Sequence, residues 1–352
     1  MEIKRLSGFD RVMLYKFDRD WNGLVVAEAR EEDLEPYLGL WFPASDVPRN
    51  ARDLYFRNPY RLIPTRSFTP ARLVPVLNPV TSHFTDLSDC NLRSVPAVHL
   101  EYLQNMGVEA SMSTPIIQDN TLWGLISCHH KTPRNLNFEM RSAFELLSPI
   151  LSAQLSAKER EQNLLRVNEL GEIYNRLLGQ MYQELDFRVG LLRHKISLLD
   201  LLSCTGVAIV YDGEVHRKGD TPGQEQIKEL VRWLQRMQVN RVYETSSLPK
   251  VFEKSLALKN LASGLLALAI SMERGEFILG FRQELLQTVE WGGNPNQAIQ
   301  FEADGKTYHP RNSFSVWQEK VKNTSLPWSA PELAIAESLR TSVLERVLKE
   351  SY

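Results

Sequence analysis

Two histidines, His99 and His129, stand among apolar residues where their side chains could meet a ligand. His99 lies within LRSVPAVHLEYLQNMGV (residues 92–108), and His129 lies within LWGLISCHH (residues 122–130). An isolated histidine in an apolar stretch is either a core residue whose ring bonds a backbone carbonyl or a member of a pocket. Neighbouring strand residues face opposite ways, so Cys128, His129 and His130 do not converge on a metal ion. The same geometry argues against Cys128 and His129 as nucleophile and base, and we expect no metal site and no catalytic residue.

The composition is that of a soluble globular protein with enough chain for two domains. Of 352 residues, 43% are hydrophobic and 24% are charged. The 41 Lys and Arg residues nearly balance the 43 Asp and Glu residues, and this argues against nucleic acid or an anionic membrane as partner. We find no apolar run of the roughly 18 residues that a spanning helix needs, and no signal peptide, so we expect a cytoplasmic protein. Three cysteines, Cys90, Cys128 and Cys204, do not suggest a disulfide framework.

The elements that would position the two histidines begin with strands. Residues 9–17 (FDRVMLYKF) and 24–28 (LVVAE) read as a strand pair around a polar turn, and proline-rich loops follow. Residues 111–117 and 122–129 flank the turn Gln118-Asp119-Asn120 and predict a second hairpin. Within it, Ser111 and Ser113 are two residues apart and therefore share one face of the strand.

From about residue 137 the hydrophobic period becomes helical. Apolar residues recur every three or four positions between charged ones, at Leu164, Val167, Leu170, Tyr174, Leu177, Met181 and Leu185. We expect one helix over about 139–187, kinked rather than ended by Pro149. Such a helix would be on the order of 70 Å long, which predicts a spine that joins two domains and forms a dimer seam.

The second half repeats the pattern of the first. Hairpins are expected at 206–211 with 214–217 and at 265–272 with 276–282, and a helix at 330–349. The second hairpin resembles residues 111–129 in pattern, a weak internal repeat of one sheet-and-helix module. Residues 283–327 are rich in Gly, Pro and Asn but also hold five large aromatic residues. Such a segment is too long for an ordinary connection and too aromatic for disorder, so we expect a functional flap.

Six motifs together resemble the photosensory region of a bacterial phytochrome, specifically its GAF and PHY domains without the preceding PAS domain. They appear in family order: FDRVMLYKF, PASDVP (43–48), LRSVPAVHLEYLQNMGV, LWGLISCHH, WGGNP (291–295) and PRNSF (310–314). The resemblance implies an α+β fold with two GAF-like domains, each an antiparallel sheet with flanking helices, joined by a long helical spine. It places the GAF domain at 1–153, the connecting helix at 154–190, and the PHY domain at 191–352 with its tongue at about 283–327.

The resemblance also implies that the first domain binds a linear tetrapyrrole (a bilin), with biliverdin expected first and phycocyanobilin as the alternative. The implied site residues are Tyr15, Phe42, Asp46, Val47, Arg61, Arg93, Val98, His99, Tyr102, Ser111, Ser113 and His129. In the family, the backbone carbonyl at Asp46 faces the pyrrole nitrogens and its carboxylate contacts the tongue. His99 matches the histidine beside the central pyrroles, and His129 the one near the ring that isomerises in light.

The remaining implied residues surround that ring or the two propionates of the pigment. Tyr15 and Tyr102 match pocket tyrosines, whereas Arg61 and Arg93 match the arginines that pair with the propionates, with Ser111 and Ser113 on the same side. Elementary chemistry agrees, because a buried bilin cation needs nearby acceptors such as a carbonyl and a neutral imidazole. A propionate in turn suits the two-pronged guanidinium of arginine.

Three departures from the family concern attachment and photochemistry. Val98 stands where many plant and cyanobacterial relatives carry the attaching cysteine, and a valine forms no thioether. Bacterial relatives use a cysteine ahead of a PAS domain, so we expect this chain as given to hold its pigment without a covalent bond. Phe42 replaces a common tyrosine and Pro96 a common serine, which removes one hydroxyl near the isomerising ring and one near a propionate.

The resemblance extends to a mechanism and to partners. Arg311 of PRNSF is implied to pair with Asp46, with Ser313 and Trp291 as further tongue contacts. Family precedent is a tongue that is a hairpin in one light state and refolds towards helix in the other, and residues 313–321 could form that helix. We expect a homodimer and a downstream output domain or response regulator; relatives are often histidine kinases, but no kinase motif is present. The alternatives are a pigment-free GAF-type scaffold for dimerisation or ligand binding and, less favoured, an enzyme built on Cys128 and His129.

Overall fold

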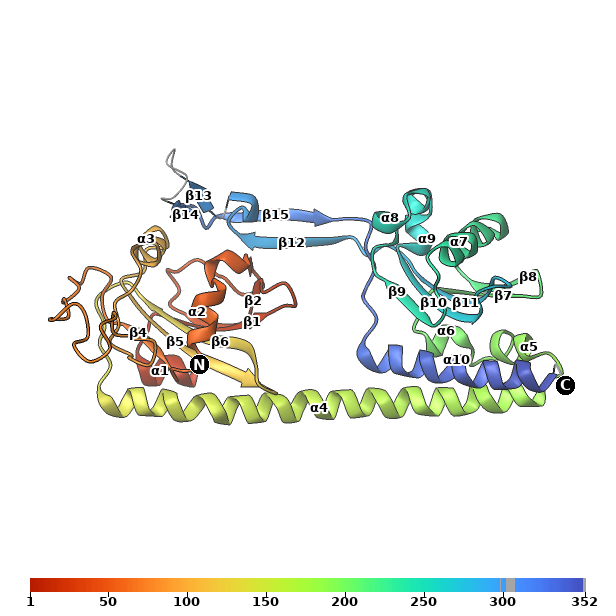
Figure 1. Cartoon of the computed structure of the whole chain (residues 1–352), viewed down its shortest axis with the longest axis horizontal. Coiled ribbons are helices and arrows are strands. Elements are labelled where there is room, and N and C mark those ends of the chain that lie inside the picture. Colours follow the sequence, from red (N-terminus) through yellow and green to blue (C-terminus); the bar gives the residue numbers. More distant parts are fainter. Residues whose placement is uncertain (298, 302–307, 351–352) are drawn as a thin grey trace. The chain divides into compact units, whose positions relative to one another are not determined.

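The structure is a computed structural model that describes residues 1–297, 299–301 and 308–350. Its backbone contacts divide the chain into two compact units (Figure 1). The first unit contains Met1–Lys158 and Thr288–Glu319, and the second contains Glu159–Gln287 and Lys320–Tyr352. Each unit has its own sheet and its own hydrophobic core, so the two are described separately.

The sheet of the first unit has the strand order β15-β12-β3-β2-β1-β6-β5-β4. Its strands are β1 Arg11–Phe17, β2 Gly23–Arg30, β3 Trp41–Phe42, β4 Arg61–Ile63, β5 Ala110–Gln118, β6 Thr121–His130, β12 Gln287–Gly292 and β15 Val316–Val321. The pairs β1–β2 and β5–β6 are the two antiparallel hairpins that alternation predicts. Asp119 and Asn120 make the second turn with positive φ, a conformation that Asp and Asn tolerate. The sequence did not indicate that β12 would pair in parallel with β3, through Trp291 and Trp41.

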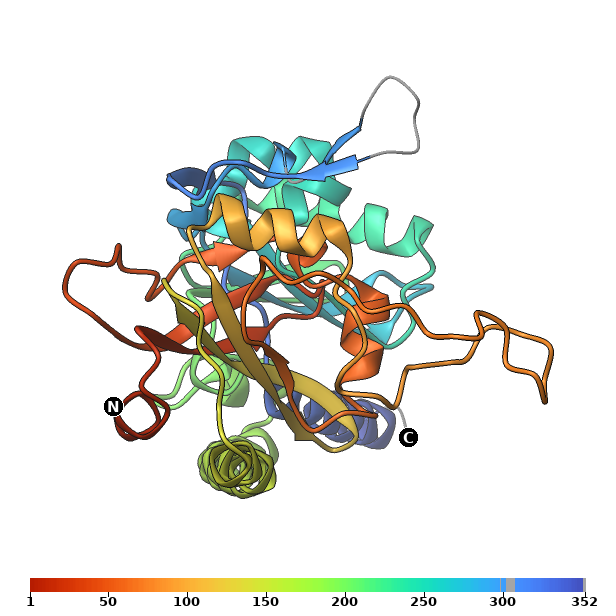
Figure 2. The ribbon, with the colours of Figure 1, turned by 90° about the vertical axis from the view of Figure 1, so that its left-hand side faces the viewer.

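Helices cover both faces of this sheet (Figure 2). They are α1 Glu2–Ser7, the 3-10 turn η1 Ala44–Asp46, α2 Arg49–Leu54, α3 Ala97–Asn105 and the first part of α4 Phe138–Gln183. One face packs against α4 through a core of Val12, Met112, Ile126 and Phe144. The opposite face, which carries Met13 and Tyr15, is covered by α3 and by irregular chain between β2 and β4.

The predicted spine helix is present as α4, but it ends four residues earlier than the expected Phe187. Asp186 starts a separate helix, α5 Phe187–Leu192, because its side chain accepts the backbone N–H of Arg188 at 2.9 Å. An aspartate at a helix N-cap satisfies an otherwise free amide and so favours a new start there. Helix α4 continues through Pro149, as expected.

The second unit is built on a five-stranded antiparallel sheet in the order β8-β7-β11-β10-β9. The strands are β7 Gly206–Tyr211, β8 Glu214–Gly219, β9 Val242–Thr245, β10 Gly264–Ser271 and β11 Glu276–Arg282. Helix α7 Gln224–Arg236 packs on one face, with Ile227 and Leu230 buried. On the other face lie α10 Ala330–Glu350, α5, α6 Leu198–Leu201 and the end of α4. The short helices α8 Leu248–Val251, η2 Glu253–Leu258 and α9 Lys259–Ala262 connect β9 to β10.

These elements confirm the predicted α+β class with two sheets and one long helix. The hairpins expected at 206–217 and 265–282 are β7–β8 and β10–β11, and the expected helix at 330–349 is α10. Helix α10 has a sequence signal for its start, because Ser329 and Glu332 have capping-box spacing and the Glu332 carboxylate accepts the Ser329 N–H at 2.8 Å.

The segment expected as a tongue is largely extended. It contains β12, the 3-10 turn η3 Pro295–Gln297, β13 Ile299–Phe301, β14 Tyr308–Pro310 and β15. Residues 298 and 302–307 lie outside the described residues. Residues 313–321, whose composition is compatible with helix, here form a loop followed by β15.

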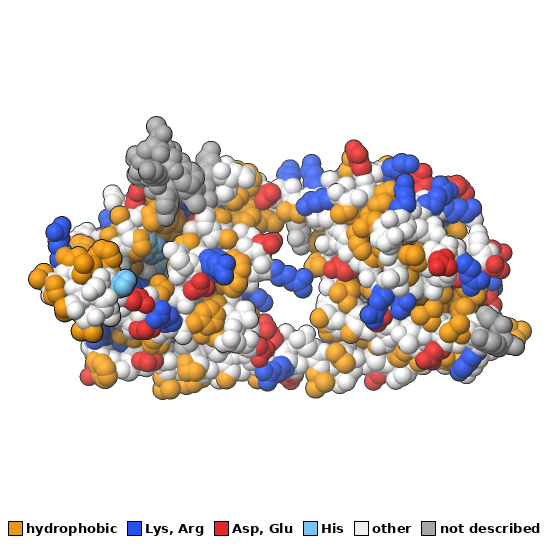
Figure 3. Space-filling view, viewed as in Figure 1, with side chains coloured by type: hydrophobic (Ala, Val, Ile, Leu, Met, Phe, Trp, Pro, Cys, Tyr) orange, Lys and Arg blue, Asp and Glu red, His pale blue; other side chains and the backbone are white. Residues whose placement is uncertain are grey.

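Residues 66–95 form a long irregular excursion from the first unit, with an isolated bridge between Leu77 and Phe84. Its exposed large apolar residues are Leu73, Val74, Val76, Leu77, Val80, Phe84 and Leu92. Orange side chains gather at the left end of Figure 3. None of the helices in the described ranges combines the length and the apolar character needed to cross a bilayer.

Candidate functional site

A cavity in the first unit collects most of the residues that the sequence singled out. It contains, with its mouth, about 650 Å³ of space outside protein atoms. Nine of the twelve expected pigment-site residues line it: Tyr15, Phe42, Asp46, Val47, His99, Tyr102, Ser111, Ser113 and His129. Arg61, Arg93 and Val98 are not among the lining residues.

Strand register explains why these side chains meet. His129 on β6 is paired with Ser111 on β5 and with Arg11 on β1, so the three lie in a row across the sheet. Paired residues of antiparallel strands point to the same face. Cys128, one position away, is fully buried in the opposite core against α4. A nucleophile–base pair of Cys128 and His129 is therefore excluded by the fold.

Helix α3 supplies the other wall of the cavity. His99, Tyr102, Leu103 and Met106 recur at helical spacing and all line it. The rings of His99 and Tyr102 stack at 5.9 Å with planes only 9° apart. Val98 is rotated about one hundred degrees from His99 on the helix, which takes it off the lining face.

Both histidines are uncharged at neutral pH. Burial, followed by the charge of Arg61, lowers the pKa of His99 to about 4. Burial, followed by Arg11 and His99, lowers the pKa of His129 to about 3. The Nδ1 atom of His129 is buried and has no hydrogen-bond partner among the described residues, while its Nε2 lies 3.3 Å from Ser127 Oγ. A buried polar atom without a partner marks a place where a ligand group can bind.

A buried ion pair closes the cavity on the side of the tongue. Arg311 donates from Nη2 to the carboxylate of Asp46, which also accepts the Tyr102 hydroxyl at 2.8 Å. The Arg311 side chain is 3% exposed and that of Asp46 5%. Burial raises the pKa of Asp46 to about 6, although Arg311 and Tyr102 oppose that rise. The pair is thus charged at neutral pH but close to the point at which it would take a proton.

Other tongue residues reinforce this contact. Phe314 packs edge-on against Tyr102 at 5.2 Å, and Asn105 Nδ2 donates to the Arg311 carbonyl at 3.1 Å. Trp291 lies near Trp41, with ring centroids 6.4 Å apart, and donates to Glu319 at 2.9 Å. The Ser313 hydroxyl, expected at the same contact, is exposed and bonds Ser315 instead.

Comparison with known proteins gives one consistent result. The family profile described as "Phytochrome region" matches residues 170–352, and the profile "GAF domain" matches residues 1–157. The chain belongs to the phytochrome family. The resemblance read from the six motifs is confirmed, including the order of GAF and PHY domains.

Named phytochromes align with nearly the whole chain. "Cyanobacterial phytochrome B" of Nostoc is 41% identical over 351 residues, 99% of this chain and 47% of the relative. The "Bacteriophytochrome" of Pseudomonas aeruginosa is 39% identical over 99% of this chain and 48% of the relative. This chain therefore spans about half the length of the curated relatives it matches.

Solved phytochrome structures share the fold. A bacteriophytochrome from the photosynthetic bacterium R. palustris superposes with a TM-score of 0.86 at 37% identity, over all of this chain and 70% of that one. The Stigmatella aurantiaca phytochrome photosensory core module gives 0.81 at 41% identity, over 99% of this chain and 69% of that one.

Two arginines of this phytochrome chain lie together without an acid. Arg61 donates to the carbonyls of Asn91 and Arg93, at 2.9 and 2.6 Å, and Arg93 donates to the Cys90 carbonyl at 3.0 Å. Among the described residues, no carboxylate lies within ion-pair distance of either guanidinium. Burial and the charge of Arg93 lower the pKa of Arg61 to about 10. Two neighbouring cations without a counter-charge fit an anionic group such as a propionate.

The cysteines of this phytochrome chain are poor candidates for pigment attachment. Burial raises the pKa of Cys128 far above its ordinary range and that of Cys204 to about 12, so neither is a thiolate at neutral pH. Cys204 also belongs to the second unit, and Cys90 does not line the cavity. In the described ranges, no group of three or more His, Cys, Asp or Glu residues could hold a metal ion.

Sequence reasoning missed several residues of the cavity wall: Met13, Val25, Tyr37, Tyr55, Leu103, Met106, Leu125 and Ser127. Strand alternation from Tyr15 would have found Met13, and helical spacing from His99 would have found Leu103 and Met106. Tyr55, whose hydroxyl lies 2.7 Å from Ser113 Oγ, follows the short helix α2 and carries no periodic signal.

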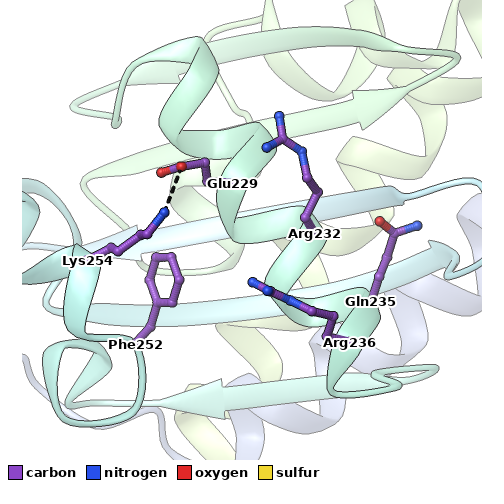
Figure 4. Close-up of a pocket in the computed structure, with 6 residues that line it drawn as sticks. All are labelled: Glu229, Arg232, Gln235, Arg236, Phe252 and Lys254. Atoms are coloured by element: carbon purple, nitrogen blue, oxygen red, sulfur yellow. Dashed lines mark hydrogen bonds and ion pairs between the residues drawn. The ribbon is translucent and has the colours of Figure 1, made fainter.

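A second hollow lies in the second unit, between α7 and η2 (Figure 4). It contains about 910 Å³ of space outside protein atoms, more than the cavity of the first unit. Its polar side chains are extended on the surface, and Lys254 donates to Glu229 at 3.1 Å across it. Because its cationic residues Arg232 and Arg236 are exposed and already solvated, this open groove is a weaker candidate than the buried cavity.

Proposed function

We propose that this chain is a red/far-red light photoreceptor module that holds a linear tetrapyrrole in the cavity of its first unit. One observation carries the proposal: two neutral, buried imidazoles line the cavity, and Arg61 and Arg93, which lie outside its lining, have no acid partner among the described residues. A bilin matches both features, because its protonated pyrroles need uncharged acceptors and its propionates need cations. Biliverdin is the bilin that we expect first.

Each residue then has a definite task. When bound, a bilin supplies a double bond that isomerises after absorption of red light. His99 accepts a hydrogen bond as a neutral imidazole, while Arg61 and Arg93 bind the propionates together with Ser111 and Ser113. His129 offers its unpartnered Nδ1 near the moving ring, and the aromatic wall of Tyr15, Phe42 and Tyr102 excludes water.

We further propose that the pigment is held without a covalent bond to this chain. Val98 has no nucleophilic atom, Cys128 faces the other core, and Cys204 lies in the other unit. After pigment loading, a denaturing gel soaked in zinc should show no bilin fluorescence on the protein band. A fluorescent band would refute this, and single replacement of Cys90, Cys128 and Cys204 would locate the bond.

The tongue is the proposed route from light to output. Isomerisation near His129 would disturb the Asp46–Arg311 pair, and the strands β12 and β15 that flank it would rearrange, with residues 313–321 turning towards helix. Exposed apolar residues on α4, namely Leu164, Leu165 and Val167, support a homodimer. A downstream output domain or response regulator would receive the signal in the cytoplasm.

A spectrum tests the proposal directly. The chain is mixed with biliverdin, freed of excess pigment, and its absorbance recorded before and after red and far-red light. We expect a red band that is shifted from free biliverdin and that converts reversibly. A chain that stays colourless would instead be a pigment-free scaffold, and a band that does not respond to light would refute the photoreceptor function.

A further inference from the structure

A second buried ion pair, Arg11 with Glu28, borders the same cavity. Arg11 begins β1 and Glu28 lies on the neighbouring strand β2. The Nε of Arg11 is 3.1 Å from Glu28 Oε1, and the two side chains are 5% and 4% exposed. Charged residues are almost never this deeply buried unless they are paired, as these two are.

The pair holds one wall of the cavity. Arg11 donates to the Glu35 carbonyl, and its guanidinium lies 3.7 Å from the centre of the Tyr37 ring. Glu28 Oε2 accepts the backbone N–H groups of Tyr37 and Leu38, at 2.9 and 3.1 Å. The ion pair thereby holds the irregular segment between β2 and β3 both by its backbone N–H groups and by the aromatic ring of Tyr37.

That wall faces the candidate pigment site. The Tyr37 ring packs edge-on against Phe42 at 5.6 Å, and both rings line the cavity. Phe42 in turn lies beneath Arg311, whose guanidinium carbon is 5.3 Å from its ring centre. A shift of the Tyr37 wall would therefore reach the ion pair of the tongue through a single aromatic ring.

Arg11 also lies directly beside His129. The two residues are paired across β1 and β6, whereas Glu28 is paired with Met13, two residues further along β1. The charged or titratable groups that act on His129 are Arg11 from β1 and His99 from α3; its neighbours Ser127 and Ser111 carry no charge. A positive charge beside an imidazole disfavours its protonated form.

We propose that Arg11 and Glu28 are positioning residues of the photoactive cavity. They fix the Tyr37–Phe42 wall, and Arg11 places a positive charge beside the imidazole of His129, while Glu28 balances that charge so that the pair adds no net charge beside the pigment. This inference rests on the proposed function and extends it to two residues that act on the pigment site without binding the pigment themselves.

Stability alone does not require these charges. Replacing a buried ion pair by groups of similar shape is often neutral or even stabilising, because burying two charges has a large desolvation cost. The double variant Arg11→Gln/Glu28→Gln removes both buried charges together and keeps amide groups for the backbone carbonyl and N–H groups. Arg30, which lies 4.0 Å from Glu28 Oε2, loses this partner but is 30% exposed and so remains in contact with water. It is therefore expected to fold.

The test follows the imidazole of His129 by nitrogen NMR in the pigment-loaded chain between pH 3 and 9, with His129→Asn to assign its signal. The wild-type ring, whose pKa is about 3, should be neutral above about pH 4. In the double variant the midpoint of protonation should rise by at least one pH unit, and the yield of photoconversion should fall. The matched control is Arg66→Gln/Glu109→Gln, an ion pair of 3.1 Å in the same unit that does not line the cavity.

A second variant separates charge from shape. Arg11→Lys keeps the positive charge but loses the planar guanidinium that reaches both Glu28 and the Glu35 carbonyl. The pKa of His129 should therefore stay as in the wild type, while the yield of photoconversion should change. Unchanged His129 signals in the double variant, or a His129 pKa that rises in Arg11→Lys, would overturn the inference. The titration can be repeated without pigment, so a chain that fails to photoconvert refutes the proposed function without deciding this one.

Discussion

Each unit of the molecule has a buried carboxylate that accepts from arginine, and the two behave in opposite ways. Asp46 in the first unit is 5% exposed and has a pKa raised to about 6. Glu332 in the second unit is 9% exposed and has a pKa lowered to about 2. Both side chains expose little surface, yet their pKa values shift in opposite directions.

Asp46 lies deeper in the protein than Glu332 and has fewer hydrogen-bond donors around it, and both differences contribute to the opposite pKa shifts. Asp46 accepts from Arg311 and Tyr102 in a setting of aromatic rings, and burial outweighs them. Glu332 Oε1 accepts from Arg166 at 3.0 Å and Arg282 at 3.2 Å, and its Oε2 accepts a backbone N–H in the first turn of α10. A helix N-terminus adds a favourable dipole for an anion.

The arginines that bind the two carboxylates also differ in how many of their N–H donors have a partner. Arg282 uses all three nitrogens, donating to the carbonyls of Ser203, Leu326 and Pro327 as well as to Glu332. In Arg311 the Nε and Nη1 atoms are buried and have no hydrogen-bond partner among the described residues. The pair of the first unit thus leaves two arginine donors without a partner among the described residues, whereas all three nitrogens of Arg282 donate. We interpret the first as a switch and the second as an anchor for the base of the tongue and for α10.

The largest effect is expected for Arg311→Ala, which removes the cationic partner of Asp46. A buried charge that loses its partner commonly costs about 3–5 kcal/mol. Asp46 should then take a proton at neutral pH. The rate of dark return after photoconversion should change more than tenfold, and pigment binding should persist. Absorbance spectroscopy measures both. Arg49→Ala, at an arginine 88% exposed and 3.9 Å from Asp53, is the control; if the two variants revert at the same rate, the pair does not set the light state.

Glu332→Gln should loosen the anchor without altering the colour. Loss of the carboxylate removes the ion-pair partner of Arg282, whereas Arg166 keeps Glu169 at 2.8 Å. The lowered pKa of Glu332 corresponds to a contribution of at most roughly 3 kcal/mol. We expect faster hydrogen exchange in residues 322–328 and at the start of α10, with an unshifted absorbance band. Glu337→Gln on the same helix, where the side chain is 31% exposed, should change exchange little. Equal protection in both variants would show that Glu332 is no anchor.

In the pigment-free chain, the stabilities of the two units should change with pH in opposite directions. Folded Asp46 holds its proton more tightly than unfolded aspartate, so its contribution to stability is complete below about pH 4 and is lost, by about 3 kcal/mol, as pH rises through about 6. Glu332 contributes fully above about pH 4.5 and loses its contribution as pH falls towards about 2. Hydrogen exchange corrected for intrinsic rates reports each unit, and Asp46→Asn or Glu332→Gln should flatten only its own trend. Parallel trends in both units would contradict the comparison.

Only part of this difference between the two units could be predicted from the sequence. Period-two alternation and the turn at Gln118–Asn120 are local signals. Both hairpins, and the face of the strand on which Ser111 lies, were therefore predictable. The capping spacing of Ser329 and Glu332 was equally local. The cluster around Glu332 was not, because Arg166, Ser203 and Arg282 come from three separate elements and meet only in the fold. Arg11 and Glu28 were missed for a related reason: a charged residue on a strand predicts exposure unless the register of its partner is known.

The smallest effect is expected for Tyr102→Phe, which removes one donor from the switch and so sharpens the comparison. The lost hydroxyl lies 2.8 Å from the Asp46 carboxylate, and a hydrogen bond to a charged group contributes about 1.5–3 kcal/mol. The pKa of Asp46 should therefore rise by roughly one to two units, further from that of Glu332. Infrared titration of the protonated carboxyl band, assigned with Asp46→Asn, measures the midpoint. Tyr55→Phe is the matched control, since its hydroxyl lines the same cavity but bonds Ser113. Should both tyrosine variants leave the midpoint unchanged, donor number would not explain why the two carboxylates differ.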